Sequence, residues 1–121
     1  MATVLAEAHV RRDGESAVVD LTGDLNSSAE DALNEAYAQA TASGADSVVL
    51  NFERAEYINS TGIALIVGLL AQARATRVQV RAFGLSDHYR EIFEITRLSD
   101  FMTITDDEDR AVSGAEWGND A

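Results

Sequence analysis

Two hydroxyl side chains, Ser60 and Thr61, hold the position in this chain that is best suited to a chemical switch. Residues 47–52 before them are rich in β-branched side chains and too few for a helix, so they predict a strand. Residues 63–70 after them are uncharged and apolar, and they predict a buried helix. A hydroxyl where a loop becomes a helix caps a free backbone N–H, and the helix dipole favours negative charge there. A phosphate on Ser60 would therefore be stabilised by its own domain.

Ser60 also has a simpler interpretation that involves no modification. Most serines at helix starts only cap a backbone N–H, and residue chemistry alone favours that role here, with Thr61 in the first turn. Gly62 fits both interpretations, because a residue without a side chain lets the backbone of a partner, or a phosphate, approach closely.

Catalytic and metal-binding chemistry finds little support in the residue types. The chain has no cysteine, and His9 and His88 are isolated in the sequence, which disfavours a zinc site and a nucleophile–base pair. Residues 106–109 are acidic, but Ala111 stands where a calcium loop needs glycine. A phospho-aspartate receiver needs a lysine, and all nine basic residues are arginine. We therefore expect a protein that is not an enzyme and needs no cofactor.

The net charge of −12 argues against a nucleic-acid partner, whose phosphates would be repelled. The same charge favours a basic or mixed-charge protein partner, and a role in solubility explains it equally well. The N-terminus lacks the basic start of a signal peptide, and the longest uncharged apolar run, residues 62–71, is about half a membrane span. The expected location is the cytoplasm, with no membrane partner.

Strand-like and helix-like segments alternate along the chain. Residues 4–10 place apolar side chains on one face and polar ones on the other, which is typical of a half-buried strand. Ser27 followed by Glu30 predicts a capping box at the start of the first helix, and Gly44 ends that helix. The full prediction is strands at about 4–10, 17–21, 47–52, 78–83 and 101–104, with helices at about 27–43, 61–75, 86–96 and from 106.

This alternation predicts an α/β fold with a mixed, mostly parallel sheet of about five strands. The first, second and fourth strands each carry a polar face, so we expect the helices mainly on one side of the sheet. The length of 121 residues suits a single domain, over residues 1–112. Residues 113–121 are expected to form a flexible tail.

Three short motifs, in this order and spacing, resemble those of STAS-domain anti-sigma factor antagonists, also called anti-anti-sigma factors. Residues 59–63 are similar to the family's Asp-Ser-Ser/Thr-Gly-Leu motif, with Asn59 where the family usually has aspartate. Residues 21–25 are similar to its apolar-x-Gly-Glu/Asp-Leu/Ile turn, and residues 90–98 to its late helix. The resemblance spans about residues 4–112 and implies a single STAS-type domain.

The resemblance also implies a function. The unphosphorylated form would bind an anti-sigma factor that is a serine kinase and so free a sigma factor for transcription. Ser60 aligns with the serine that is phosphorylated in such antagonists, Thr61 is the second choice, and a serine phosphatase would reverse the modification. The implied partner-binding residues lie at one end of the fold: Gly23, Asp24, Leu25, Asn26, Ser27, Asn59, Thr61, Gly62, Leu65 and Leu69.

An alternative function stays open. The chain would then be a non-switching STAS scaffold in a signalling assembly or a lipid-transport complex, with Ser60 only a cap and Asn59 marking the loss of regulation. Leu65 and Leu69 form a stripe on the second helix, which is either covered by the other helices or free for a partner.

Overall fold

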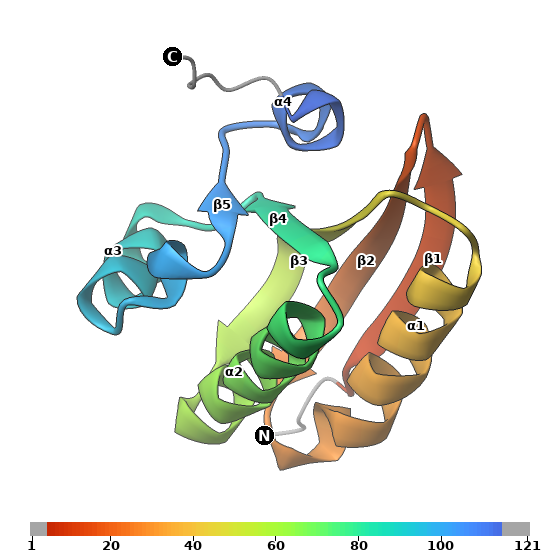
Figure 1. Ribbon diagram of the computed structural model, residues 1–121. Coiled ribbons are helices and arrows are strands. Elements are labelled where there is room, and N and C mark those ends of the chain that lie inside the picture. The colour runs from red at the N-terminus through yellow and green to blue at the C-terminus, as the bar shows by residue number, and fades with distance from the viewer. Residues whose placement is uncertain (1–4, 115–121) are drawn as a thin grey trace.

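Figure 1 shows the computed structural model, which describes residues 5–114. Five strands form one sheet in the order β1-β2-β3-β4-β5. β1 and β2 are antiparallel, and each later strand is parallel to the one before it. The strands are β1 (Glu7–Asp13), β2 (Ser16–Leu25), β3 (Ser47–Ile58), β4 (Gln79–Phe83) and β5 (Thr103–Ile104). This arrangement confirms the predicted α/β class with a mixed, mostly parallel sheet.

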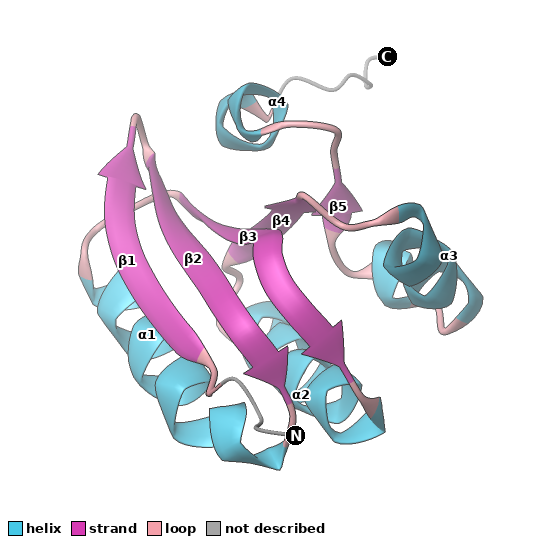
Figure 2. Ribbon diagram, turned by 180° about the vertical axis from the view of Figure 1, so that it is seen from behind, coloured by secondary structure: helices cyan, strands magenta, loops and turns pink. Residues whose placement is uncertain are grey.

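The helices lie mainly on one face of this sheet, as predicted. They are α1 (Glu30–Ala42), α2 (Ser60–Ala75), α3 (Asp87–Ile95) and α4 (Glu108–Ser113). Figure 2 shows α1 and α2 side by side behind β1, β2 and β3. α4 is the helix that lies on the opposite face of the sheet. α3 joins the same core as α1 and α2, because Phe93 packs edge-on against Phe52 of β3, with 5.8 Å between the ring centroids.

The buried stripe of α1 follows the helical period. Its members recur three or four residues apart, so they share one face of the helix and pack onto the sheet. They are Leu33, Ala36, Tyr37 and Ala40. The exposed face of α1 carries polar and acidic side chains, which explains why this helix was recognisable from its sequence.

A second, smaller core holds α4 on the opposite face of the sheet. It consists of Val18, Val49, Phe83 and Ala111. Beside it, Arg11 of β1 donates hydrogen bonds to Asp20 of β2 at 2.7 Å and to Glu108 of α4 at 2.7 Å. The hydrogen bonds from Arg11 to Glu108 are the main cause that lowers the pKa of Glu108 to about 2. A charged cluster therefore fixes the C-terminal helix across the first two strands.

β3 is much longer than the sequence predicted. The apolar pattern ends at Phe52, but the strand continues to Ile58 through residues that are mostly exposed. Its second half is held by backbone pairing with β2, which follows it through two register shifts, the second just after Gly23. The pairing ends with Leu25 beside Ile58. This extension carries the start of α2 to the end of β2.

The remaining boundaries differ by a few residues. β1 begins at Glu7 and runs to Asp13, whereas the strand was expected over residues 4–10. Residues 1–4 and the expected tail beyond Gly114 lie outside the described residues.

Candidate phosphorylation and partner-binding site

Asn59, and not Ser60, caps α2. The side-chain oxygen Oδ1 of Asn59 accepts a hydrogen bond from the Gly62 N–H at 2.8 Å, and its carbonyl accepts one from the Ile63 N–H at 2.9 Å. Its backbone is extended, with φ −92° and ψ −177°, as an N-cap residue requires. The interpretation of Ser60 as the cap is therefore wrong, because Ser60 is the first residue of the helix itself.

The cap explains how asparagine is accommodated at a position where the motif usually has aspartate. Both residues are strong N-caps, because each presents an oxygen at the same distance from the backbone. The exchange keeps the hydrogen bond to Gly62 and removes one negative charge beside Ser60. The departure from the motif thus leaves the local structure intact.

The Ser60 side chain is exposed, and its hydroxyl makes no hydrogen bond with any residue between 5 and 114. The first backbone N–H groups of a helix lack partners within the helix and carry its partial positive charge. The first turn of α2 contains no acidic side chain. A phosphate on Ser60 would therefore meet the positive end of a 16-residue helix with no carboxylate in the same turn.

Gly62 is needed by the chain's own packing. A Cβ built on Gly62 would lie 2.0 Å from the carbonyl oxygen of Leu25, at the end of β2. The same carbonyl accepts a hydrogen bond from the Asn59 N–H at 3.2 Å. The expectation that Gly62 admits the backbone of a partner or a phosphate is wrong for this structure, because the end of β2 already occupies that space. Gly62 instead allows α2 to begin against β2.

The segment from Gly23 to Ser27 lies at the same end of the sheet as the start of α2. Its first three residues belong to β2, where Gly23 adopts a positive φ of 83° beside the register shift. Asn26 follows and caps a 3-10 turn, Ser27–Ala29: its Oδ1 accepts hydrogen bonds from the Ser28 N–H at 2.9 Å and the Ser28 hydroxyl at 2.6 Å. The two predicted parts of the site are therefore neighbours.

The capping box predicted for Ser27 and Glu30 does not form. α1 begins at Glu30, and no side chain caps it. The asparagine one position before Ser27 satisfies the first free N–H, so a 3-10 turn precedes the helix.

Burial divides the predicted partner-binding residues into two groups. Those with buried side chains or backbones are Gly23, Leu25, Gly62 and Leu69, of which Leu69 is only 5% exposed in the main core. Those at least partly accessible are Asp24, Asn26, Ser27, Asn59, Thr61 and Leu65. Leu69 is thus covered by the main core, whereas Leu65 packs against this core and stays partly accessible. We define the Ser60 face as Asn26, Ser27, Asn59, Ser60 and Thr61.

Sequence reasoning missed Tyr57, which borders the Ser60 face. Its side chain is 58% exposed, and its Cα pairs with that of Asp24 across β2 and β3. An exposed aromatic side chain is a frequent anchor in protein interfaces. The signal was an aromatic residue two positions before Asn59, between the predicted strand and the predicted helix.

Two further tests concern the described part of the chain. Between residues 5 and 114, no three metal-ligating side chains come together in a way that would hold an ion. Over the same residues, no helix has both the length and the apolar character to cross a membrane.

Comparison with known proteins identifies the family to which the chain belongs. The family described as "Mlab, STAS domain" matches residues 8–105, which include both parts of the Ser60 face. The chain belongs to the STAS domain family. Its relatives include the anti-sigma-B factor antagonist of Staphylococcus aureus (strain NCTC 8325 / PS 47), which is 30% identical over 88 residues, 73% of this chain and 82% of that protein. The anti-sigma-B factor antagonist of Listeria monocytogenes serovar 1/2a is 36% identical over 78 residues, 63% of this chain and 64% of that protein.

Solved structures share this fold. The anti-sigma factor antagonist SpoIIAA in its unphosphorylated form matches with a TM-score of 0.65 and 21% identity, over 85% of this chain and 91% of that one. An anti-sigma factor antagonist from Mycobacterium paratuberculosis matches with a TM-score of 0.74 and 15% identity, over 90% and 92%. The comparisons confirm the predicted family and its non-enzymatic class.

Proposed function

We propose that this STAS domain is an anti-sigma factor antagonist whose binding is controlled by phosphorylation of Ser60. The observation that carries the proposal is the exposed Ser60 hydroxyl at the first position of α2, beside a cap that Asn59 supplies. Because the Ser60 hydroxyl does not cap α2, it can be modified without loss of a structural hydrogen bond. The relatives named as anti-sigma-B factor antagonists indicate the class of partner, an anti-sigma factor.

The switch works through charge at the interface. A phosphoserine carries about −2 charge at neutral pH and three strong acceptor oxygens. Within the domain the N-terminus of α2 favours this negative charge. A partner bound to the Ser60 face would either desolvate the phosphate or be repelled by it, and both cost binding free energy. A penalty of about 3 kcal/mol weakens binding by about a hundredfold. The unphosphorylated form is therefore the binding form, and it frees a sigma factor by occupying the anti-sigma factor.

The remaining parts of the cycle follow from this role. The anti-sigma factor is the serine kinase that modifies Ser60, and a serine phosphatase restores the hydroxyl. The protein works in the cytoplasm, together with the transcription machinery that a sigma factor serves.

The first experiment identifies the modified residue. Protein purified from its native host, and protein incubated with the host's anti-sigma factor kinase and ATP, are analysed by peptide mass spectrometry. We expect phosphate on Ser60 and none on the adjacent Thr61. Modification of Thr61 alone would overturn the assignment, as would no modification under conditions that label a known antagonist.

The second experiment measures partner binding by calorimetry. Ser60→Ala should bind like the wild type, because the exposed first helical residue contributes little to stability, within about 0.5 kcal/mol. Ser60→Asp should bind far more weakly, since its charge lies on the Ser60 face. Ser99→Asp is the matched control: it adds the same charge at an exposed serine beside the far end of α2 and should leave affinity unchanged.

The same variants decide between the switch and the alternative of a non-switching STAS scaffold. Equal affinities of the wild type, Ser60→Ala and Ser60→Asp would refute the switch and favour the scaffold. Equal weakening by Ser60→Asp and Ser99→Asp would show a general charge effect and would refute a local role for Ser60.

A further inference from the structure

The solvent-facing side of α2 carries no charge before its last turn. Residues 60–73 contain no acidic or basic side chain, although the whole chain has a net charge of −12. Val67, near the middle of the helix, is 46% exposed. It borders a mostly apolar cleft of about 240 Å³ that is also lined by Phe101, which is 50% exposed. Contiguous exposed apolar surface of this kind is typical of a contact with another protein.

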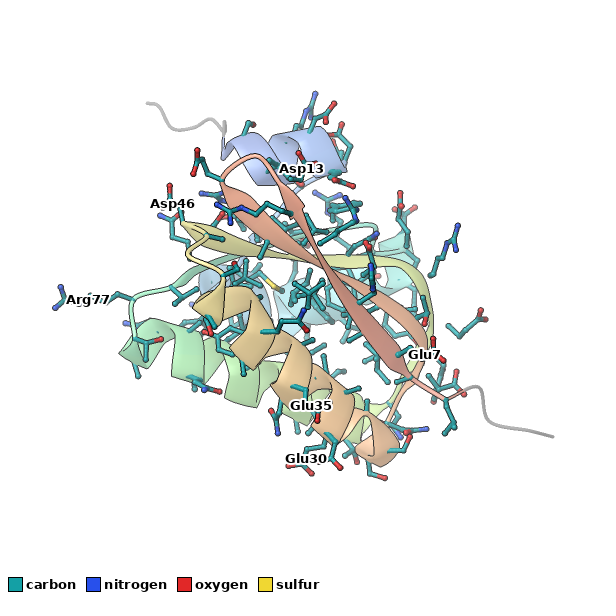
Figure 3. All side chains as sticks on the ribbon, turned by 90° about the vertical axis from the view of Figure 1, so that its right-hand side faces the viewer. Glu7, Asp13, Glu30, Glu35, Asp46 and Arg77 are labelled. Atoms are coloured by element: carbon teal, nitrogen blue, oxygen red, sulfur yellow. The ribbon has the colours of Figure 1, made fainter. Side chains whose placement is uncertain are left out.

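Two arginines without a carboxylate partner lie at the C-terminal end of α2. Arg74 and Arg77 border a groove of about 560 Å³ there, and neither forms an ion pair with any carboxylate of residues 5–114. The Arg74 guanidinium lies 5.2 Å from the centre of the Phe101 ring, and Figure 3 shows Arg77 beyond the end of α2. Arg81 also lines the groove, but its guanidinium already donates hydrogen bonds within the domain. Arg74 and Arg77 therefore remain available for an anion of another molecule.

Ser60 and Arg74 lie on the same flank of α2, at its opposite ends. They are fourteen residues apart, which is close to four helical turns and about 21 Å along the helix axis. Val67 lies midway between them. A twofold axis beside Val67 and perpendicular to α2 would place a second α2 antiparallel to the first, with Ser60 of each copy opposite Arg74 of the other. One helix thus supplies both sides of a self-complementary contact.

We propose that phosphorylation of Ser60 promotes pairing of two copies of this chain through α2, with each phosphate bound by Arg74 and Arg77 of the other copy. This inference rests on the phosphorylation proposed above. A second copy fits this surface because the exposed apolar side chain of Val67 lies where the twofold axis passes. The charges fit as well, since the phosphate and the arginines occupy positions that the same axis brings together.

The phosphate is what makes the pair stable. Two unmodified copies, each with a net charge of −12, repel one another, and only the apolar contact opposes this repulsion. Hydrogen bonds between arginine and phosphate are charge-assisted and therefore strong, and the symmetry forms them twice. In the pair Ser60 and Thr61 are covered, so the surface that would bind the anti-sigma factor is already occupied.

The experiment uses the full chain with phosphoserine incorporated at position 60 during translation. Sedimentation equilibrium measures the dissociation constant of the dimer for this chain and for the unmodified chain. We expect the phosphoserine chain to dimerise about tenfold more tightly. Because no kinase is used, this result is separate from the phosphosite mapping: an unmodified Ser60 in the host refutes the proposed function, whereas a monomeric phosphoserine chain refutes the pairing.

Arginine variants locate the phosphate-binding groups. The double substitution Arg74→Gln and Arg77→Gln should abolish the difference between the phosphoserine chain and the unmodified chain. Arg54→Gln is the matched control, because Arg54 is exposed and has no ion pair among the described residues but lies on β3. It should leave the difference unchanged. Far-UV circular dichroism and urea unfolding check that every variant is folded.

Single cysteines test which surfaces meet, because the chain has no cysteine of its own. Val67→Cys in the phosphoserine chain should give a disulfide-linked dimer under mild oxidation, since Val67 lies beside the twofold axis. Ala38→Cys, at an exposed position on α1, is the matched control and should stay largely unlinked.

Three results would overturn the proposal. The first is a phosphoserine chain that dimerises no more tightly than the unmodified chain; weaker binding of the anti-sigma factor by the double arginine variant would then assign this face of α2 to that partner. The second is tighter dimerisation that survives the double arginine substitution or is lost equally with Arg54→Gln. The third is equal linking through Val67→Cys and Ala38→Cys.

Discussion

The contact between Gly62 and Leu25 predicts that two glycines of the same helix respond to alanine with opposite signs. An alanine at an ordinary helical position stabilises by about 1 kcal/mol relative to glycine. Gly68 fits this case, since a Cβ there would meet nothing within 4 Å. Gly62 does not, because its Cβ would lie 2.0 Å from the Leu25 carbonyl oxygen, where a real contact is at least 3.0 Å.

The size of the effect at Gly62 follows from what must move. Relieving the contact shifts the start of α2 from β2 by at least 1.0 Å, the difference between 3.0 and 2.0 Å. That shift breaks the hydrogen bond from the Asn59 N–H to Leu25, which is already 3.2 Å long. Overpacking costs about 1–3 kcal/mol and an unsatisfied N–H about 1–3 kcal/mol more, against a gain of about 1 kcal/mol in helix propensity. We expect Gly62→Ala to destabilise the fold by about 3 kcal/mol.

Urea unfolding of the two variants measures this difference. With a slope of about 1.5 kcal/mol per molar urea, Gly62→Ala should lower the midpoint by about 2 M, and Gly68→Ala should raise it slightly. The slopes should stay equal, since both variants unfold from the same native surface. If Gly62→Ala proved as stable as the wild type, the close approach of β2 to α2 would be refuted.

Two further predictions concern side chains that hold the ends of helices. Asn59→Ala should destabilise the fold by about 1 kcal/mol, because it removes the cap of α2. Asn59→Asp should be neutral or slightly stabilising, since aspartate caps equally well and its negative charge is favoured at the helix N-terminus. Equal thermal unfolding midpoints for the two variants would contradict the capping role. The pKa of Glu108, ordinarily 4.5, is lowered to about 2, chiefly by the hydrogen bonds that Arg11 donates to it, so its stabilising effect is complete above pH 4.5 and is lost as the pH falls toward 2. Glu108→Gln should therefore be less stable than the wild type at pH 7 and lose less stability between pH 4.5 and 2, as measured by urea unfolding. Glu91→Gln, at an exposed position on α3, is the matched control and should have the same urea midpoints as the wild type.

The order and type of the elements could be predicted because their signals are local. The stripe on α1 recurs within four residues, and the strand core of β3 is a continuous apolar run. A glycine that ends a helix, such as Gly44, also acts within one helical turn. The same local logic failed at Ser27 and Ser60, where an asparagine one position earlier is the actual cap. Sequence inspection placed both helix starts to within a few residues but assigned the capping hydrogen bond to the wrong side chain.

By itself, the sequence determined the α/β class, the STAS motifs and a hydroxyl at the start of α2, since these depend on residues that are neighbours along the chain. Only the tertiary structure decided the length of β3, the burial of Leu69 and the fit of Gly62 against Leu25. It also brought Arg74 of α2 and Arg81 of β4 into one groove with Phe101. Each of these features depends on a partner element distant in sequence, whose position follows from the sheet order and register rather than from any local pattern.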